Sequence, residues 1–182
     1  IHIRSMSGGP LENFEMMLYA EAHDKEGLVI DVRNNGGGWT TDYLLAMLTI
    51  ENHAITVPRD GEEGYPQGRR PLYAWTKPIV VLTNEYSYSN AEIFAHAIQT
   101  LDRGEVVGEP TGGLVISTGG IRLIDGSSFR VPFRGWYVKD DMMNMENNGA
   151  VPDIIVQDKP GDTAIHVDRQ LERAVKELQS DL

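Results

Sequence analysis

Two short apolar runs constrain the fold of this chain more than any other feature. Residues 27–32, GLVIDV, and residues 78–83, PIVVLT, lack polar alternation, which is typical of strands buried on both faces of a sheet. Each run leads through a polar turn into a segment with helical spacing of apolar residues, at about 41–50 and at 91–101. This order predicts an α/β fold, with a mostly parallel central sheet and flanking helices.

The rest of the chain extends this pattern. Residues 9–24 predict an amphipathic helix, residues 58–71 a surface loop rich in Pro, Gly and charge, and residues 163–178 a closing helix. Further strands are predicted at 105–108, 114–118, 120–124, 127–133 and 152–156. With 182 residues the chain is long enough for one domain, residues 1–182. Because it begins with Ile, we expect it to be a fragment of a longer protein.

Composition excludes several classes of function. The formal net charge of −11 argues against a nucleic-acid partner, which usually requires a basic surface. The absence of cysteine excludes disulfides, thiolate zinc sites and cysteine nucleophiles. Five scattered histidines offer no metal-binding motif, so we expect no metal and no cofactor. No apolar stretch approaches the ~20 residues of a membrane span, so no membrane partner is expected.

The glycine triplet Gly36–Gly38 follows the first apolar run. In a parallel sheet, ligands gather beyond the carboxyl ends of the strands, which is where this triplet lies. Glycines allow a ligand to approach backbone amides closely, as the oxyanion hole of an acyl-transfer enzyme requires. A tight turn without chemistry explains the same three residues.

Ser89 lies between the second apolar run and its helix. With Glu92 three residues later it matches a capping box, which is a purely structural role. A serine at a strand-to-helix turn is also a well-placed nucleophile, because the following amide, that of Asn90, and the helix N-terminus stabilise an anion there. Ser87 is the competing serine, but it should lie outside the helix.

A general base for Ser89 does not emerge from residue spacing. His96 lies seven residues after Ser89, which is about 10 Å along a helix and too far for a hydrogen bond. His2 lies in a strand-like segment at the start of the chain, and spacing alone does not place it beside Ser89. The residues by themselves therefore give a candidate nucleophile and candidate oxyanion amides, without a base.

Four segments taken together resemble a known family. GLVIDVRNNGGG, PIVVLTNEYSYSNAEIFAHAI, GEVVGEPTGG and MENNGAVPDIIV are similar to the C-terminal processing (tail-specific) serine peptidases, and most closely to their tricorn core protease branch. The resemblance covers essentially the whole chain. It implies a crotonase/ClpP-like spiral core of ββα units and a serine peptidase activity.

The resemblance also implies roles for individual residues. Ser89 would be the nucleophile, His2 its general base, and Glu146 the acid that polarises the imidazole. The oxyanion hole would be formed by three backbone amides, those of Gly37, Gly38 and Asn90. The lysine base of the ordinary processing peptidases is replaced by Leu114, which excludes a Ser–Lys dyad at that place. Ile1 replaces the serine that links base and acid in the tricorn branch, and a hydrocarbon side chain relays no hydrogen bond.

The function implied is hydrolysis of peptide bonds in oligopeptides or unfolded protein segments. The resemblance further implies a cytoplasmic location, additional domains upstream and assembly into homo-oligomers. Two alternatives remain at this point. One is a crotonase-like acyl-CoA enzyme that uses the same oxyanion amides, and the other is a non-catalytic peptide-binding domain that has lost its base.

Overall fold

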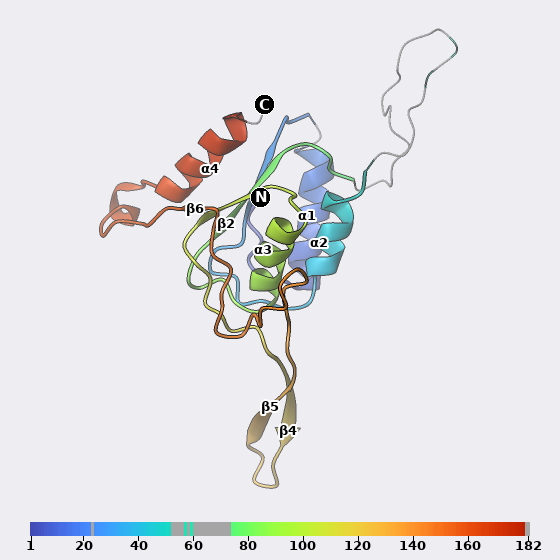
Figure 1. Cartoon of the computed structure of the whole chain (residues 1–182), viewed down its shortest axis with the longest axis vertical. Coiled ribbons are helices and arrows are strands. Elements are labelled where there is room, and N and C mark those ends of the chain that lie inside the picture. The colour runs from blue at the N-terminus through green and yellow to red at the C-terminus, as the bar shows by residue number, and fades with distance from the viewer. Residues whose placement is uncertain (23, 52–56, 58, 60–73, 181–182) are drawn as a thin grey trace.

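The structure, a computed structural model, describes residues 1–22, 24–51, 57, 59 and 74–180. Its central sheet contains four parallel strands in the order β1-β2-β3-β6 (Figure 1). Their bounds are Leu28–Asp31 for β1, Ile79–Thr83 for β2, Glu105–Gly108 for β3 and Ile154–Ile155 for β6. The predicted parallel α/β sheet is therefore confirmed. The loop predicted at 58–71 lies outside the described residues, except for Arg59.

Residues 1–6 run alongside β1 and widen the sheet at that edge. His2 forms an isolated parallel bridge with Asp31, and Met6 forms another with Gly38. The first six residues are thus laid against β1 and the glycine turn that follows it.

Helices cover the two faces of the sheet unequally. Helices α1 (Gly8–Ala20), α2 (Thr41–Leu48) and α3 (Asn90–Thr100) share one hydrophobic core with residues of β1, β2 and β3. Helix α4 (Arg169–Ser180) packs on the opposite face (Figure 1). The predicted start of this last helix, at 163, is wrong. Residues Thr163–Ile165 form a separate 3-10 turn, and His166 has a positive φ of 57° that interrupts the helix.

The central strand β2 shows why its sequence is apolar throughout. All five of its residues are buried. Ile79 and Val81 belong to the core beneath α1, α2 and α3, whereas Val80 and Leu82 belong to the core beneath α4. Because successive side chains of a strand point to opposite faces, a strand covered on both sides has no solvent-facing position for a polar residue.

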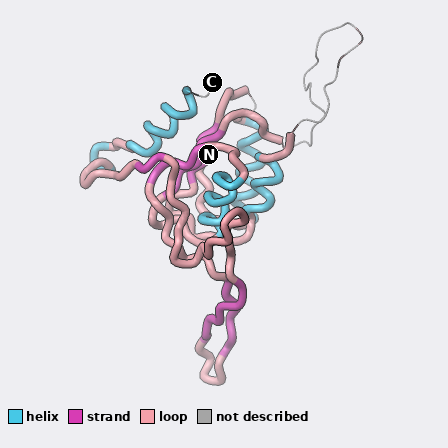
Figure 2. Tube along the Cα trace, in the orientation of Figure 1, coloured by secondary structure: helices cyan, strands magenta, loops and turns pink. Residues whose placement is uncertain are grey.

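A second, two-stranded sheet lies outside this core. Strands β4 (Ser117–Arg122) and β5 (Ser128–Arg134) pair in antiparallel fashion and project from the rest of the molecule as a hairpin (Figure 2). The strands predicted at 114–118 and 120–124 both overlap one strand, Ser117–Arg122, which continues through Gly119 and Gly120. The strand predicted for residues 114–116 is wrong, since these residues precede β4.

None of the helices in the described part of the chain combines the length and apolar composition that a membrane span requires.

Candidate active site

Ser89 occupies a strained turn between β2 and α3. Its backbone angles, φ 55° and ψ −116°, lie outside the regions that non-glycine residues favour. Such strain costs on the order of 1–3 kcal/mol and tends to be kept at functional sites. Ser89 is half-buried, and its N–H donates to Glu92 Oε1 at 3.0 Å, as in a capping box. The residue therefore caps α3 in a backbone conformation that an ordinary cap does not need.

The competing serine, Ser87, has a structural role. It is fully buried, and its hydroxyl donates to the Val32 carbonyl oxygen at 2.9 Å. This bond ties the turn after β2 to the end of β1 and leaves Ser89 as the serine that could act on a substrate.

The glycine turn after β1 touches the Ser89 turn directly. Gly37 has a φ of +93°, and a Cβ placed on it would lie 2.6 Å from Ser89 Cβ, so only glycine fits. The Gly37 N–H already donates to Asn35 Oδ1 at 2.9 Å. Asn35 is buried and donates in turn to the Ile3 carbonyl oxygen at 2.7 Å. Gly37 therefore lies against the Ser89 turn, but its N–H is already hydrogen-bonded to Asn35.

Gly38 offers the amide that Gly37 lacks. Met6 donates to the Gly37 carbonyl oxygen at 2.9 Å and accepts from the Trp39 N–H at 2.7 Å, so the residues on either side of Gly38 bond to Met6. In such a bridge the N–H of the middle residue points away from the paired strand, and here that is toward the side of β2 and Ser89. A Cβ at Gly38 would lie 1.8 Å from the Met6 carbonyl oxygen, which excludes any other residue.

Asn90 begins α3 and joins it to α2. The first N–H groups of a helix have no partner within the helix, so the Asn90 amide is directed at the end of α3 where an anion would bind. Its side-chain oxygen accepts from the Thr41 N–H at 3.0 Å, and its carbonyl oxygen accepts from the Thr41 hydroxyl at 2.7 Å. The prediction used only the Asn90 amide. The role of its side chain in capping α2 could not be predicted, because Thr41 lies 49 residues away in the chain.

Glu92 connects the Ser89 turn to a remote segment. Its fully buried carboxylate accepts from the Thr111 hydroxyl at 2.6 Å, the Gly113 N–H at 2.5 Å and the Leu114 N–H at 2.8 Å. Together with the bond from Ser89, four donors compensate the buried charge. The sequence predicted only the local cap, because the other three donors lie about twenty residues further along the chain.

Glu146 binds the two residues that follow Gly113 and Leu114. The half-buried Glu146 carboxylate accepts from the Val115 N–H at 2.7 Å and the Ile116 N–H at 2.8 Å. Four successive amides, those of residues 113–116, are thus held by two carboxylates. We refer to residues 113–116 as the amide segment. Because Glu92 binds both this segment and the Ser89 turn, the amide segment connects Glu146 to Ser89.

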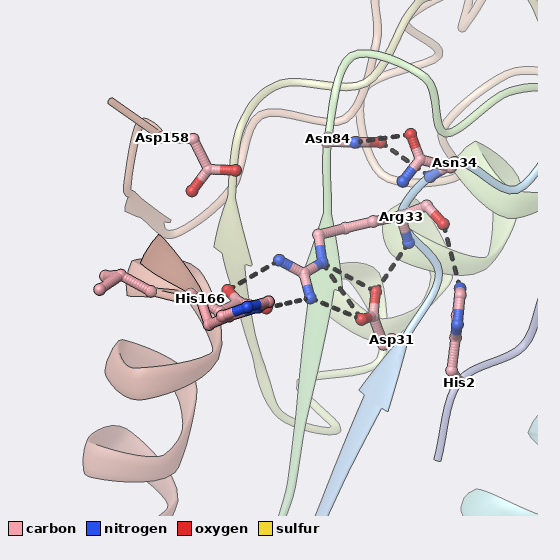
Figure 3. A pocket seen from close by; sticks show the side chains of 9 residues that line it. His2, Asp31, Arg33, Asn34, Asn84, Asp158 and His166 are labelled. Carbon is pink, nitrogen blue, oxygen red and sulfur yellow. Dashed lines mark hydrogen bonds and ion pairs between the residues drawn. The ribbon is translucent and has the colours of Figure 1, made fainter. Parts of the chain in front are cut away.

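His2 lies elsewhere. Its ring donates to the Arg33 carbonyl oxygen at 3.4 Å and lines a pocket of about 480 Å³ together with Asp31, His166 and Asp168 (Figure 3). Ser89 does not line this pocket. His2 pairs with Asp31 at the end of β1, whereas Met6 pairs with Gly38 in the glycine turn that contacts Ser89, so His2 lies four residues before the part of this edge that is level with the Ser89 turn.

The two candidate residues also face opposite sides of the sheet. The pocket around His2 is closed by residues 166–168, which lead into α4, whereas Ser89 caps α3 on the other face. The structure therefore brings together Ser89, the glycine turn and Asn90, and links them to Glu146, but it does not bring His2 to Ser89. Among the described residues, no histidine or lysine hydrogen-bonds to Ser89.

The His2 pocket contains a charge network of its own. Arg33 forms ion pairs with Asp31 (2.7 Å) and Asp168 (2.8 Å), and these bonds raise the pKa of the guanidinium above its ordinary value. The hydrogen bond from Arg33 lowers the pKa of the Asp168 carboxyl. Figure 3 shows the bonds from Arg33 to Asp31, and two nitrogens of this guanidinium also donate to Asp168. Within the described ranges, no three His, Asp or Glu side chains are grouped so as to hold a metal ion.

Comparison with known proteins identifies the family. Residues 1–156 match Peptidase family S41. The tricorn protease of Thermoplasma volcanium is 33% identical over 184 residues, which cover 100% of this chain and 17% of that protein. The chloroplastic C-terminal processing peptidase of Tetradesmus obliquus is 32% identical over 113 residues, covering 58% of this chain and 23% of that protein.

Structural similarity points the same way. A crystal structure of the tricorn protease superposes with a TM-score of 0.84 at 29% sequence identity, covering 98% of this chain and 18% of that one. The chain thus spans about one sixth of the length of the tricorn proteins that it resembles. Family match, sequence similarity and fold agree over most of its residues, and the chain belongs to peptidase family S41.

Proposed function

We propose that this chain is the part of a serine peptidase that carries the nucleophile and the oxyanion hole. The observation that supports this most directly is the contact between the strained Ser89 turn and the glycine turn after β1. A helix cap needs neither the positive φ of Ser89 nor a glycine pressed against its Cβ. A nucleophile needs both an exposed hydroxyl and nearby amides.

The proposed reaction begins with attack of Ser89 Oγ on the carbonyl carbon of a peptide bond. The carbonyl oxygen becomes an oxyanion, which accepts hydrogen bonds from the Gly38 and Asn90 amides, and the N-terminus of α3 adds a favourable dipole. Collapse of the tetrahedral intermediate expels the amine, which takes a proton, and leaves an ester on Ser89. Water then hydrolyses the ester and regenerates the hydroxyl.

The base that removes the Ser89 proton is proposed to come from outside the described residues. His2 would have to cross from the α4 face of the sheet to take this role. Since the chain spans about one sixth of its tricorn relatives, residues beyond this chain could complete the site. Glu146, connected to the Ser89 turn through the amide segment and Glu92, is proposed to orient that base.

Fluorophosphonate labelling tests this assignment. We expect Ser89→Ala to abolish labelling of a version of the chain extended upstream, and to reduce peptide hydrolysis by several powers of ten. Ser87→Ala is the matched control, since Ser87 donates to a backbone carbonyl oxygen and should leave labelling intact. His2→Ala should also leave the labelling rate unchanged.

Four results would contradict parts of this proposal. Labelling that persists in Ser89→Ala places the nucleophile elsewhere. Loss of labelling in His2→Ala restores His2 as the base. No labelling of either the chain or its extended version favours a peptide-binding domain, and turnover of an acyl-CoA thioester without an ester on Ser89 favours a crotonase-like enzyme.

The substrates are proposed to be oligopeptides or unfolded protein segments. This rests on the relatives, which are named as proteases and as a C-terminal processing peptidase. A cytoplasmic location and further domains upstream of this chain are proposed on the same similarity to tricorn proteases.

A further inference from the structure

A cavity of about 510 Å³ lies beside the second half of helix α3. Its other walls come from residues 110–111 and from residues 138–151, which follow the hairpin. We call it the His96 cavity. Ser89 does not line it and lies seven residues before His96, about 10 Å along the helix axis. The cavity is therefore separate from the Ser89 turn, and its volume falls within the roughly 300–1,000 Å³ of small-molecule sites.

His96 is a buried polar side chain in the wall of this cavity, with an exposed fraction of 6%. Its Nε2 lies 3.4 Å from the Asn148 carbonyl oxygen. A carbonyl oxygen only accepts, so Nε2 is the nitrogen that carries the proton. Burial lowers the pKa of His96, which keeps the ring neutral at pH 7. The second nitrogen, Nδ1, is then an acceptor without a proton.

This Nδ1 acceptor is open to a ligand. Among the described residues, none donates a hydrogen bond to it. Every fully buried side-chain nitrogen or oxygen in the described part of the chain has a partner, so Nδ1 must border open space. The open space that His96 lines is the His96 cavity. A polar group in such a position usually has a partner, since an unpaired acceptor in a buried side chain is unfavourable.

Three other polar side chains of the walls already have partners within the protein. The Gln99 amide donates to a backbone carbonyl oxygen at 2.9 Å and to a carboxylate at 3.0 Å. The Thr111 hydroxyl donates to a carboxylate at 2.6 Å, and the Asn148 amide donates to a backbone carbonyl oxygen at 2.9 Å. These bonds fix the walls and leave His96 Nδ1 as a defined point for recognition.

The remaining walls favour an apolar and uncharged ligand. Val138, Met143 and Val151 contribute apolar side chains. None of the described residues that line the cavity carries a formal charge at pH 7. An ion would lose its hydration here without gaining a partner of opposite charge, whereas an aromatic ring would pack favourably against the methionine sulfur.

We propose that the His96 cavity binds a small, uncharged, mostly apolar molecule that donates one hydrogen bond to His96 Nδ1. Phenol is the simplest compound with this chemistry. Its ring would lie against the apolar walls, and its hydroxyl would donate to the imidazole. The site does not include Ser89, so it does not depend on whether Ser89 is a nucleophile.

The His96 cavity shares a wall with the loop that carries Glu146. Asn148 accepts from His96 through its carbonyl oxygen, and its side chain donates to the Glu146 carbonyl oxygen at 3.4 Å. The Glu146 carboxylate in turn accepts from the Val115 and Ile116 amides. A ligand that fills the cavity should therefore restrict this loop and slow hydrogen exchange at these two amides.

NMR of the 182-residue chain with ¹³C-labelled methionine methyl groups tests the proposal. Phenol should shift the Met143 methyl signal with a dissociation constant of about 1 mM, and leave that of Met16, exposed on α1, in place. Toluene, which has the same shape without the donor, should bind at least ~tenfold more weakly. Benzoate, the charged analogue, should leave Met143 unchanged at about 10 mM.

Substitutions then test the role of the imidazole. His96→Phe keeps an aromatic ring and removes the acceptor, so phenol should lose its ~tenfold advantage over toluene. His2→Phe, a matched change outside the cavity, should keep that advantage. Ser89→Ala should bind phenol with an unchanged dissociation constant, which separates this proposal from that of the nucleophile. Hydrogen exchange at Val115 and Ile116 should slow at least ~threefold with bound phenol.

Equal affinity of the unsubstituted chain for phenol and toluene would overturn the proposal, and this comparison requires no variant to fold. A Met143 signal that does not move with phenol, or that moves equally with benzoate, would overturn it as well. So would a preference for phenol that survives in His96→Phe. Unchanged exchange at Val115 and Ile116 would overturn the link to the Glu146 loop.

Discussion

Gly36 and Gly37 are neighbours in sequence with opposite surroundings. A Cβ on Gly37 would meet Ser89 Cβ at 2.6 Å in a left-handed backbone conformation, whereas a Cβ on Gly36 would meet nothing within 4 Å. We expect Gly37→Ala to displace the Ser89 turn, lower stability by about 2 kcal/mol and strongly reduce labelling of Ser89. Gly36→Ala should stay within about 0.5 kcal/mol and keep its reactivity, as measured by urea unfolding and fluorophosphonate labelling. Equal effects of the two changes would argue against a functional contact at Gly37.

Glu92 is the residue on which the geometry of the site depends most. In Glu92→Gln the amide nitrogen would face backbone N–H groups that now donate to a carboxylate, so donors would oppose donors. We expect a loss of about 3 kcal/mol in urea unfolding. Glu146→Gln is the control, since that carboxylate is half-exposed and accepts from two amides, and we expect about 1 kcal/mol. A larger loss in Glu146→Gln would reverse this ranking.

At the scale of elements, helix α4 is held to the sheet by an ion pair as well as by its apolar side. Arg33, just after β1, binds Asp168, which precedes α4, and lowers the pKa of that carboxyl. A lowered pKa stabilises the fold above the unfolded value near 3.9, and this stabilisation is lost as pH falls through the lower folded value. Asp168→Asn should therefore reduce stability at pH 7 and flatten its fall below pH 4. pH-dependent urea unfolding measures both effects, and an unchanged slope in Asp168→Asn would contradict the role of this ion pair.

For the whole molecule, the sequence predicted the central layers well because their signals are local. The runs at 27–32 and 78–83 are mostly apolar because helices cover both faces of the sheet, and the capping box marks the start of α3. The face of the sheet on which a residue lies depends on contacts with residues that are remote in the sequence. Which face His2 occupies depends on its pairing with Asp31, and the partners of Glu92 depend on a segment that returns from residue 111. The exposed hairpin could not be predicted either, since its strands carry the same alternation as half-buried ones.

The placement of α3 and α4 on opposite faces means that the sheet separates the Ser89 turn from the His2 pocket. Ser89, the proposed nucleophile, lies on one side of the sheet, and the ion pairs of Arg33 lie on the other side, together with His2 and His166. A substitution on one side of the sheet should therefore leave the reactivity of residues on the other side unchanged, as is usual for sites that share no contacts. Asp168→Asn can weaken the fold while the folded fraction still reacts at Ser89 with an unaltered rate constant. In this fold, substitutions can therefore change the stability of the chain and the reactivity of Ser89 independently.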